Sequence, residues 1–166
     1  MWHRKAALVL PGFLKGIPGS GNQRMPADHK IPHDYAVMFV RTDTTIERRE
    51  QMLQDFYRAE LKRLMPEMLE KWQPKLGVEA RAWGIKRMKT KWGTCNIEAR
   101  RIWLNLELAK KPVQCLEYIL VHELAHLHER HHNDRFISLL DQHLPQWKLL
   151  KDQLNSSVLA DERWNH

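Results

Sequence analysis

The chain has 166 residues, of which 43% are hydrophobic and 28% are charged, and its formal net charge is +7 at pH 7. This length suits one compact domain that buries a core without covalent staples. Cys95 and Cys115 are the only cysteines, which excludes a disulfide framework. Because the N-terminal segment makes no convincing signal peptide, we expect a reducing, cytoplasmic location, and no segment is apolar for long enough to span a membrane.

Glycine and proline are concentrated at the N-terminus. Residues 1–34 contain four of the seven glycines and four of the eight prolines, which predicts a loop-rich or partly disordered arm. A short strand is expected at Tyr35–Val40. We therefore predict a single domain over residues 35–155, followed by a C-terminal tail at residues 156–166.

A long amphipathic helix is expected next. Thr44, with Glu47 three residues later, forms a capping box that predicts its start. Apolar residues then follow at helical spacing, as ordinary core packing requires. They are Met52, Leu53, Phe56, Leu61, Leu64 and Met65. Pro66 predicts a kink or a restart of the helix, and Pro74 and Gly77 predict its end.

Two extended runs lie between Val78 and Leu106, and their alternating apolar residues predict a small antiparallel sheet. An edge strand of such a sheet can receive substrate backbone by β-addition, although a purely structural role fits the pattern equally well.

Many of the positive charges lie in or near these strands. They are Lys86, Arg87, Lys89, Lys91, Arg100, Arg101, Lys110 and Lys111. A surface of this kind suits an acidic substrate or nucleic acid. No zinc finger, helix-turn-helix or stacking aromatic motif accompanies the charges, so a solvated basic face is the simpler interpretation.

The strongest chemical pattern in the chain is the H-E-x-x-H run formed by His122, Glu123 and His126. Residues four apart lie on one face of an α-helix, so both imidazoles can point at a single ion with Glu123 beside them. Pro112 suits the first turn of that helix, and the apolar residues after it have helical spacing. The pattern is typical of a catalytic zinc site with a general base.

A third ligand is expected from beyond the helix. His132 lies six residues after His126, about 600° around a continuous helix and about 9 Å along it, so the chain must first leave the helix and turn back. Asn133 is a good N-cap for a new helix, which places the break before it. We predict His132 as the third ligand, with His131 as the nearest alternative, whereas a distant acid such as Asp152 has no supporting motif.

Three protein ligands leave a fourth position for water, which indicates a catalytic site. Glu123 is expected to take a proton from a zinc-bound water and to pass it to the leaving group, a mechanism suited to peptide or amide bonds. Metzincins share this histidine spacing, but they carry a glycine where this chain has Glu129 and a methionine turn further on. No methionine follows Met88 here, so an ordinary metzincin is excluded.

Several motifs together resemble those of the YgjP-like metallopeptidase family, which is similar to the SprT and WLM zinc proteases. The motifs are Lys89–Cys95 with its W-G-[ST]-C element, Ile102–Asn105, Leu116–Ile119 leading into His122–His132, Phe136, and Pro145–Trp147. The resemblance covers about residues 45–155. It implies a zincin-like α+β fold, Zn²⁺ held by His122, His126 and His132, and Glu123 as the catalytic residue. Cys95 is expected to be a packed, inert cysteine, with an inhibitory thiolate ligand as the alternative.

The expected function is therefore that of a zinc-dependent metallopeptidase acting on a peptide or protein substrate. The alternative is a metal-dependent ribonuclease or nucleic-acid-binding protein, because the ribosome-maturation family YbeY has a comparable histidine spacing. That family has no glutamate after its first histidine, so Glu123 favours the peptidase. Nucleic acid is a possible partner that no sequence motif supports, and a membrane partner is not expected. Nothing in the sequence specifies an oligomeric state.

Overall fold

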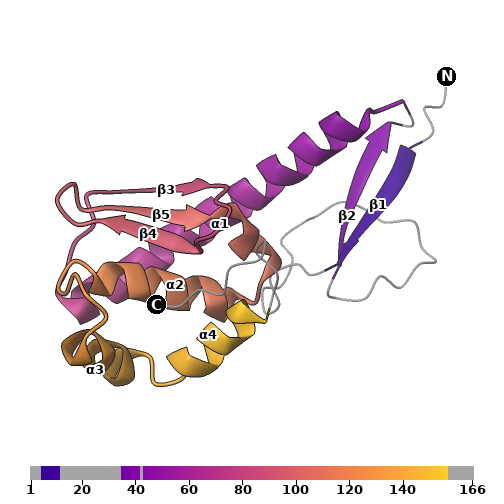
Figure 1. The fold of residues 1–166 in the computed structure, drawn as a ribbon. Helices are drawn as coiled ribbons and strands as arrows, with labels where there is room; N and C mark the ends of the chain where they lie inside the picture. The colour runs from indigo at the N-terminus through magenta and orange to yellow at the C-terminus, as the bar shows by residue number, and fades with distance from the viewer. Residues whose placement is uncertain (1–4, 12–34, 42, 157–166) are drawn as a thin grey trace.

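The computed structural model describes residues 5–11, 35–41 and 43–156, which form an α+β protein. Two sheets are present in this part of the chain, one of two strands and one of three. In Figure 1 the three-stranded sheet lies over helix α2 (Val113–Ala125), while α3 (Asp134–His143) and α4 (Trp147–Asn155) lie on the other side of that helix. None of the helices among the described residues has both the length and the apolar character needed to cross a membrane.

Strands β1 (Lys5–Pro11) and β2 (Tyr35–Arg41) pair antiparallel, with Ala7 opposite Phe39. The predicted strand at Tyr35–Val40 is thus confirmed. Within the segment predicted as a loop-rich arm, Lys5–Pro11 forms a strand that the sequence did not predict, because its partner strand begins more than twenty residues further along the chain. The rest of the arm, residues 12–34, and the tail after Ser156 lie outside the described residues.

Helix α1 (Ile46–Leu76) is the longest element. Its N-cap is Thr45, whose side chain accepts a hydrogen bond from the backbone N–H of Arg48 at 3.2 Å, so the predicted cap was one residue too early. The helix continues through Pro66 without a restart, because buried residues on either side of this proline, Met65 and Leu69, hold both halves against the core. The helix ends at Gly77, whose positive φ of 64° suits glycine.

The three-stranded sheet has the order β3 (Ala82–Lys86), β5 (Arg101–Asn105), β4 (Gly93–Asn96). Strands β4 and β5 form the expected antiparallel pair, but β3 and β5 are parallel, so the sheet is mixed rather than wholly antiparallel. The reason is that residues 87–92 carry the chain past the place that β5 later fills. Strand β4 is therefore an edge strand, and among the described residues it pairs only with β5.

Helix α2 lies at the centre of the core. Every residue from Cys115 to Ala125 except Glu117 is buried. The helix is covered by Ile102 and Leu104 of β5 on the sheet side and by residues of α1 such as Leu61, all fully buried. A helix held on so many sides is a rigid support for any side chains that project from its end.

Candidate metal centre and active site

The end of helix α2 brings two of the predicted ligands together. His122 is buried in its last turn, and His126 follows one turn later as its half-buried C-cap. The centroids of their rings lie 5.0 Å apart. The predicted helix and the shared face of the two histidines are thus present.

The third histidine returns to this point because the chain leaves the helix after His126. Asn133 caps α3, its side-chain oxygen accepting a hydrogen bond from the backbone N–H of Phe136 at 3.1 Å. This cap fixes the preceding residue so that Nε2 of His132 lies 3.1 Å from Nε2 of His122. Candidate ligand atoms of His122, His126 and His132 all lie within 4.8 Å of one another.

These distances can be compared with those of a metal site. Two nitrogens bound tetrahedrally to zinc at about 2.0–2.1 Å lie about 3.3 Å apart. The separation between His122 and His132 is close to this value, and all the donors are imidazole nitrogens, which zinc and several other transition metals accept. The three residues therefore fit a metal ion.

The other nearby histidines lie elsewhere. Nε2 of His128 contacts the carbonyl oxygen of Leu76 at the end of α1, and His131 is exposed, with its backbone N–H donating to Oε1 of Glu129. Neither joins the cluster, whereas His132 does.

Phe136 packs against all three members of the cluster. Its fully buried ring has its centroid 4.9 Å from that of His122, 4.7 Å from that of His126 and 4.7 Å from that of His132. His126 is oriented further by a contact of 3.1 Å between its Nδ1 and the carbonyl oxygen of Glu129. When Nδ1 donates this hydrogen bond, Nε2 carries the free lone pair.

Glu123 lies beside the histidines and is almost wholly buried, with 2% of its surface exposed. Burial raises the pKa of its carboxyl to about 8, and the positive charge of Lys91 acts in the opposite direction. The carboxylate packs against Gly93 of β4, since a Cβ atom there would lie 2.7 Å from Oε1 of Glu123. The W-G-[ST]-C element and the H-E-x-x-H run are thus in direct contact.

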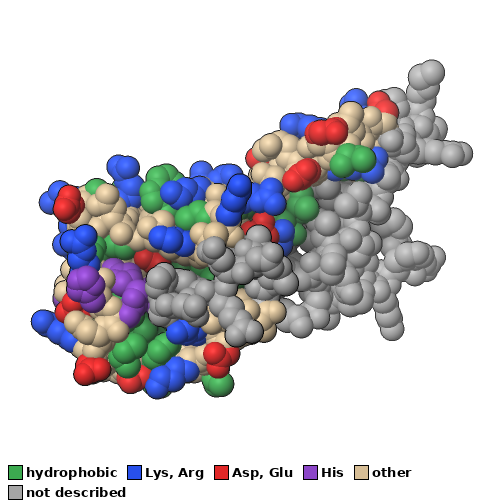
Figure 2. Space-filling model, viewed as in Figure 1, with side chains coloured by type: hydrophobic (Ala, Val, Ile, Leu, Met, Phe, Trp, Pro, Cys, Tyr) green, Lys and Arg blue, Asp and Glu red, His purple; other side chains and the backbone are tan. Residues whose placement is uncertain are grey.

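A cavity of about 760 Å³ opens in front of this group. One wall is strand β4 with the following turn, residues 93–98, and the other is the end of α2 with the loop that leads to His132. Figure 2 shows histidine side chains gathered on the surface at this end of the molecule. Cys95 also lines the cavity, but burial and the charge of Glu123 raise the pKa of its thiol to about 12, which favours the inert thiol over a thiolate.

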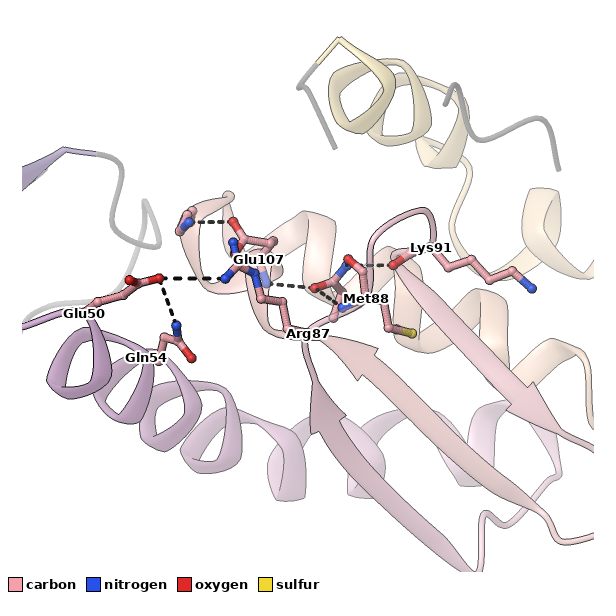
Figure 3. Close-up of polar contacts among 8 residues, drawn as sticks. Glu50, Gln54, Arg87, Met88, Lys91 and Glu107 are labelled. Atoms are coloured by element: carbon pink, nitrogen blue, oxygen red, sulfur yellow. Dashed lines mark hydrogen bonds and ion pairs between the residues drawn. The ribbon is translucent and has the colours of Figure 1, made fainter. Parts of the chain in front are cut away.

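Sequence reasoning gave no role to Asn105, a wholly buried residue at the end of β5. Its side-chain nitrogen donates to the carbonyl oxygens of Met88, at 2.9 Å, and Lys91, at 2.7 Å. Its backbone N–H donates to the carbonyl oxygen of Trp92 at 2.8 Å. Figure 3 shows these side-chain bonds at Met88 and Lys91. Asn105 thus fixes the loop that leads into β4 and places Gly93 against Glu123.

A small sheet packed on a helix with an H-E-x-x-H motif, and a third histidine from the loop before the next helix, define a zincin-like hydrolase. The chain belongs to the YgjP-like metallopeptidase family, whose model, described as "YgjP-like, metallopeptidase domain", matches residues 19–157. It is therefore a metallopeptidase, and the resemblance inferred from the sequence motifs is confirmed.

Solved structures are similar in fold. The crystal structure of the metallopeptidase zymogen of Pyrococcus abyssi abylysin has a TM-score of 0.51 and 23% identity, covering 55% of this chain and 91% of that chain. The metallopeptidase zymogen of Methanocaldococcus jannaschii jannalysin has a TM-score of 0.48 and 20% identity, covering 54% and 91%. No curated protein matches the chain. The first likeness agrees with the zincin-like α+β class expected from the sequence.

Proposed function

We propose that this metallopeptidase is zinc-dependent, that His122, His126 and His132 hold the ion, and that Glu123 is the general base. The observation that carries the proposal is the convergence of three imidazoles beside a buried carboxylate in one open cavity. A structural zinc site is closed by four protein ligands, whereas this cluster has three among the described residues and faces a cavity.

Zn²⁺ held there would act as a Lewis acid: it would polarise a carbonyl oxygen and lower the pKa of water to about 7. Imidazole is a common zinc ligand, and the contact between His126 Nδ1 and Glu129 leaves Nε2 for the ion.

Glu123 moves the proton. Its carboxylate would take a proton from the attacking water and deliver it to the nitrogen of the broken amide bond. The close contact with Gly93 limits where the carboxylate can lie, because backbone rather than a flexible side chain stands behind it. A fixed base loses less entropy in the transition state than a mobile one.

Strand β4 offers a binding site for the substrate backbone. Among the described residues it pairs only with β5, and its residues line the cavity across from the end of α2. An extended peptide can add to this edge through main-chain hydrogen bonds, which need no particular side chains. This supports a peptide or protein substrate.

The proposal is tested with Glu123→Gln. The variant should fold and keep its zinc, as measured by metal analysis, while cleavage of a peptide library falls by about 10²- to 10⁴-fold. Glu117→Gln is the matched control, because Glu117 lies on the same helix but bonds to Lys71 and Trp72 outside the cavity. It should keep full activity. An equally active Glu123→Gln protein, or a wild type that cleaves RNA and no peptide, would contradict the proposal.

A further inference from the structure

Lys91 combines a fixed backbone with an exposed side chain at one end of the cavity. Its carbonyl oxygen is held by buried Asn105 at 2.7 Å. Arg87, in the same loop, lies 3.8 Å from carboxylate oxygens of both Glu50 and Glu107, as Figure 3 shows. Within the described part of the chain, by contrast, the Lys91 ammonium makes no ion pair. The backbone of this cavity-lining residue is therefore fixed, and its ammonium has no carboxylate at ion-pair distance among the residues that the structure describes.

The two ends of the cavity differ in charge. Lys91 precedes β4, so it lies at the end where the strand begins. Beyond the other end of the strand lies Glu98, and Arg130 from the loop before α3 also lines the cavity. Glu98 offsets Arg130 in the charge lining the cavity, while the acid of this lining that the Lys91 charge acts on is the buried Glu123, the proposed base. A substrate lying along β4 thus meets a basic group near the start of the strand.

The direction of the substrate depends on the sense of its pairing with β4, which we take to be antiparallel. A peptide that pairs antiparallel with β4 has its C-terminal half beside the beginning of this strand. This half carries the residues after the cleaved bond. Lys91 therefore lies where these residues, or the C-terminus itself, would be bound.

We propose that Lys91 is a specificity-determining residue that recognises a carboxylate on the C-terminal side of the cleaved bond. This inference rests on the proposed peptidase function and names its substrate class, peptides that are acidic after the cleaved bond. The carboxylate comes either from an Asp or Glu side chain or from the C-terminus of the substrate. The shared chemistry is an anion paired with a positioned ammonium.

Binding tests the inference independently of turnover. Zinc-loaded Glu123→Gln protein is titrated with fluorescein-labelled peptides, and anisotropy is measured. The first pair of peptides has either Asp or Lys after the bond that is cut in a library digest. If no bond is cut, Asp and Lys are compared at each position of the peptide in turn. A second pair differs by a free against an amidated C-terminus. We expect the carboxylate-bearing member of at least one pair to bind about fivefold more tightly, as for a partly exposed ion pair.

Substitutions at Lys91 give the decisive comparison. Adding Lys91→Glu should reverse this preference, and Lys91→Arg should keep it. Lys89→Glu is the matched control, because Lys89 is exposed in the same loop but does not line the cavity. It should leave the preference unchanged. If Lys91→Glu abolishes the binding preference in the first peptide pair, Lys91 recognises a side-chain carboxylate. If it abolishes the preference in the second pair, Lys91 recognises the C-terminus.

Turnover provides a second readout. In the active enzyme, Lys91→Glu should change the ratio of kcat/KM between the two members of a pair, and any effect on Glu123 cancels in this ratio because both substrates share the base. Equal binding of both members of each pair, or an equal effect of Lys89→Glu, would overturn the inference. A wild type that binds acidic peptides through Lys91 but cleaves none would refute the proposed function and leave this recognition standing.

Discussion

Gly93 and Glu123 are in direct contact across the cavity wall, since a Cβ atom on Gly93 would lie 2.7 Å from Oε1 and 2.9 Å from Cγ of Glu123. The two residues are thirty positions apart in the chain, one on a strand and the other on a helix. The contact explains why a glycine occupies this place in the W-G-[ST]-C element. Any side chain there would compete with the carboxylate for the same space.

Gly93→Ala should therefore displace Glu123 and lower kcat by at least about tenfold, because small misplacements of a base are costly. The metal content should stay at the wild-type level, since the three atoms nearest to this Cβ belong to Glu123 and Ile119 and not to a histidine. Gly84→Ala is the control: its Cβ would also clash, but with the ring of Trp103 on β5 and not with any cavity residue. It is expected to reduce stability by about 1–3 kcal/mol and to leave kcat near wild type. Full activity of Gly93→Ala would show that Glu123 tolerates displacement.

The choice between the neighbouring histidines can be checked by metal analysis. His132→Ala should lose bound metal, because Nε2 of His132 is 3.1 Å from Nε2 of His122. His131→Ala should retain it, because His131 lies outside the cluster. The opposite pattern would transfer the ligand role to His131.

Phe136 is expected to tune metal affinity without being a ligand. Phe136→Leu keeps an apolar residue of similar size but loses the ring that packs against three imidazoles, so we expect about tenfold weaker metal binding in a competitive chelator titration. Leu140→Val is the matched control on the same helix, since Leu140 is equally buried but lies outside the ring cluster. Equal metal affinity in both variants would show that Phe136 contributes only to core packing and does not affect metal binding.

Cys95 should be unreactive despite lining the cavity. Its pKa of about 12 lies above that of a free thiol, so the folded protein holds the proton through neutral pH and loses it only in strongly alkaline solution. Iodoacetamide should label Cys95 at pH 8 at least about 100-fold more slowly than it labels the unfolded chain. The pKa of this thiol is raised because burial disfavours the charged thiolate. Rapid labelling of the folded protein would favour the alternative of a thiolate poised near the metal.

The parts of the site that local spacing defines were predictable. His122 and His126 lie four residues apart at the end of a helix, and Asn133 is recognisable as the N-cap of the next helix. The sequence therefore predicted that the chain turns back between them and brings His132 near the other two histidines. The contacts of Gly93 with Glu123 and of Asn105 with Lys91 were not predictable, because they join separate segments whose approach depends on the tertiary fold.

The same distinction applies to the fold. Strand β1 was missed because its partner is distant, and the parallel pairing of β3 with β5 was missed because strand order is not encoded in alternation. The continuation of α1 through Pro66 shows burial on both sides overriding a local helix breaker.

The short length of β4 restricts the shape of anything bound along it. Four residues, Gly93–Asn96, span about 13 Å of extended chain, enough to pair with about four residues of another peptide. A substrate segment that is folded as a helix or a closed turn has no four consecutive extended residues to pair with this strand. If this strand receives the substrate, folded proteins would be protected from cleavage wherever their chains stay packed, and damaged or unfolding regions would become accessible first.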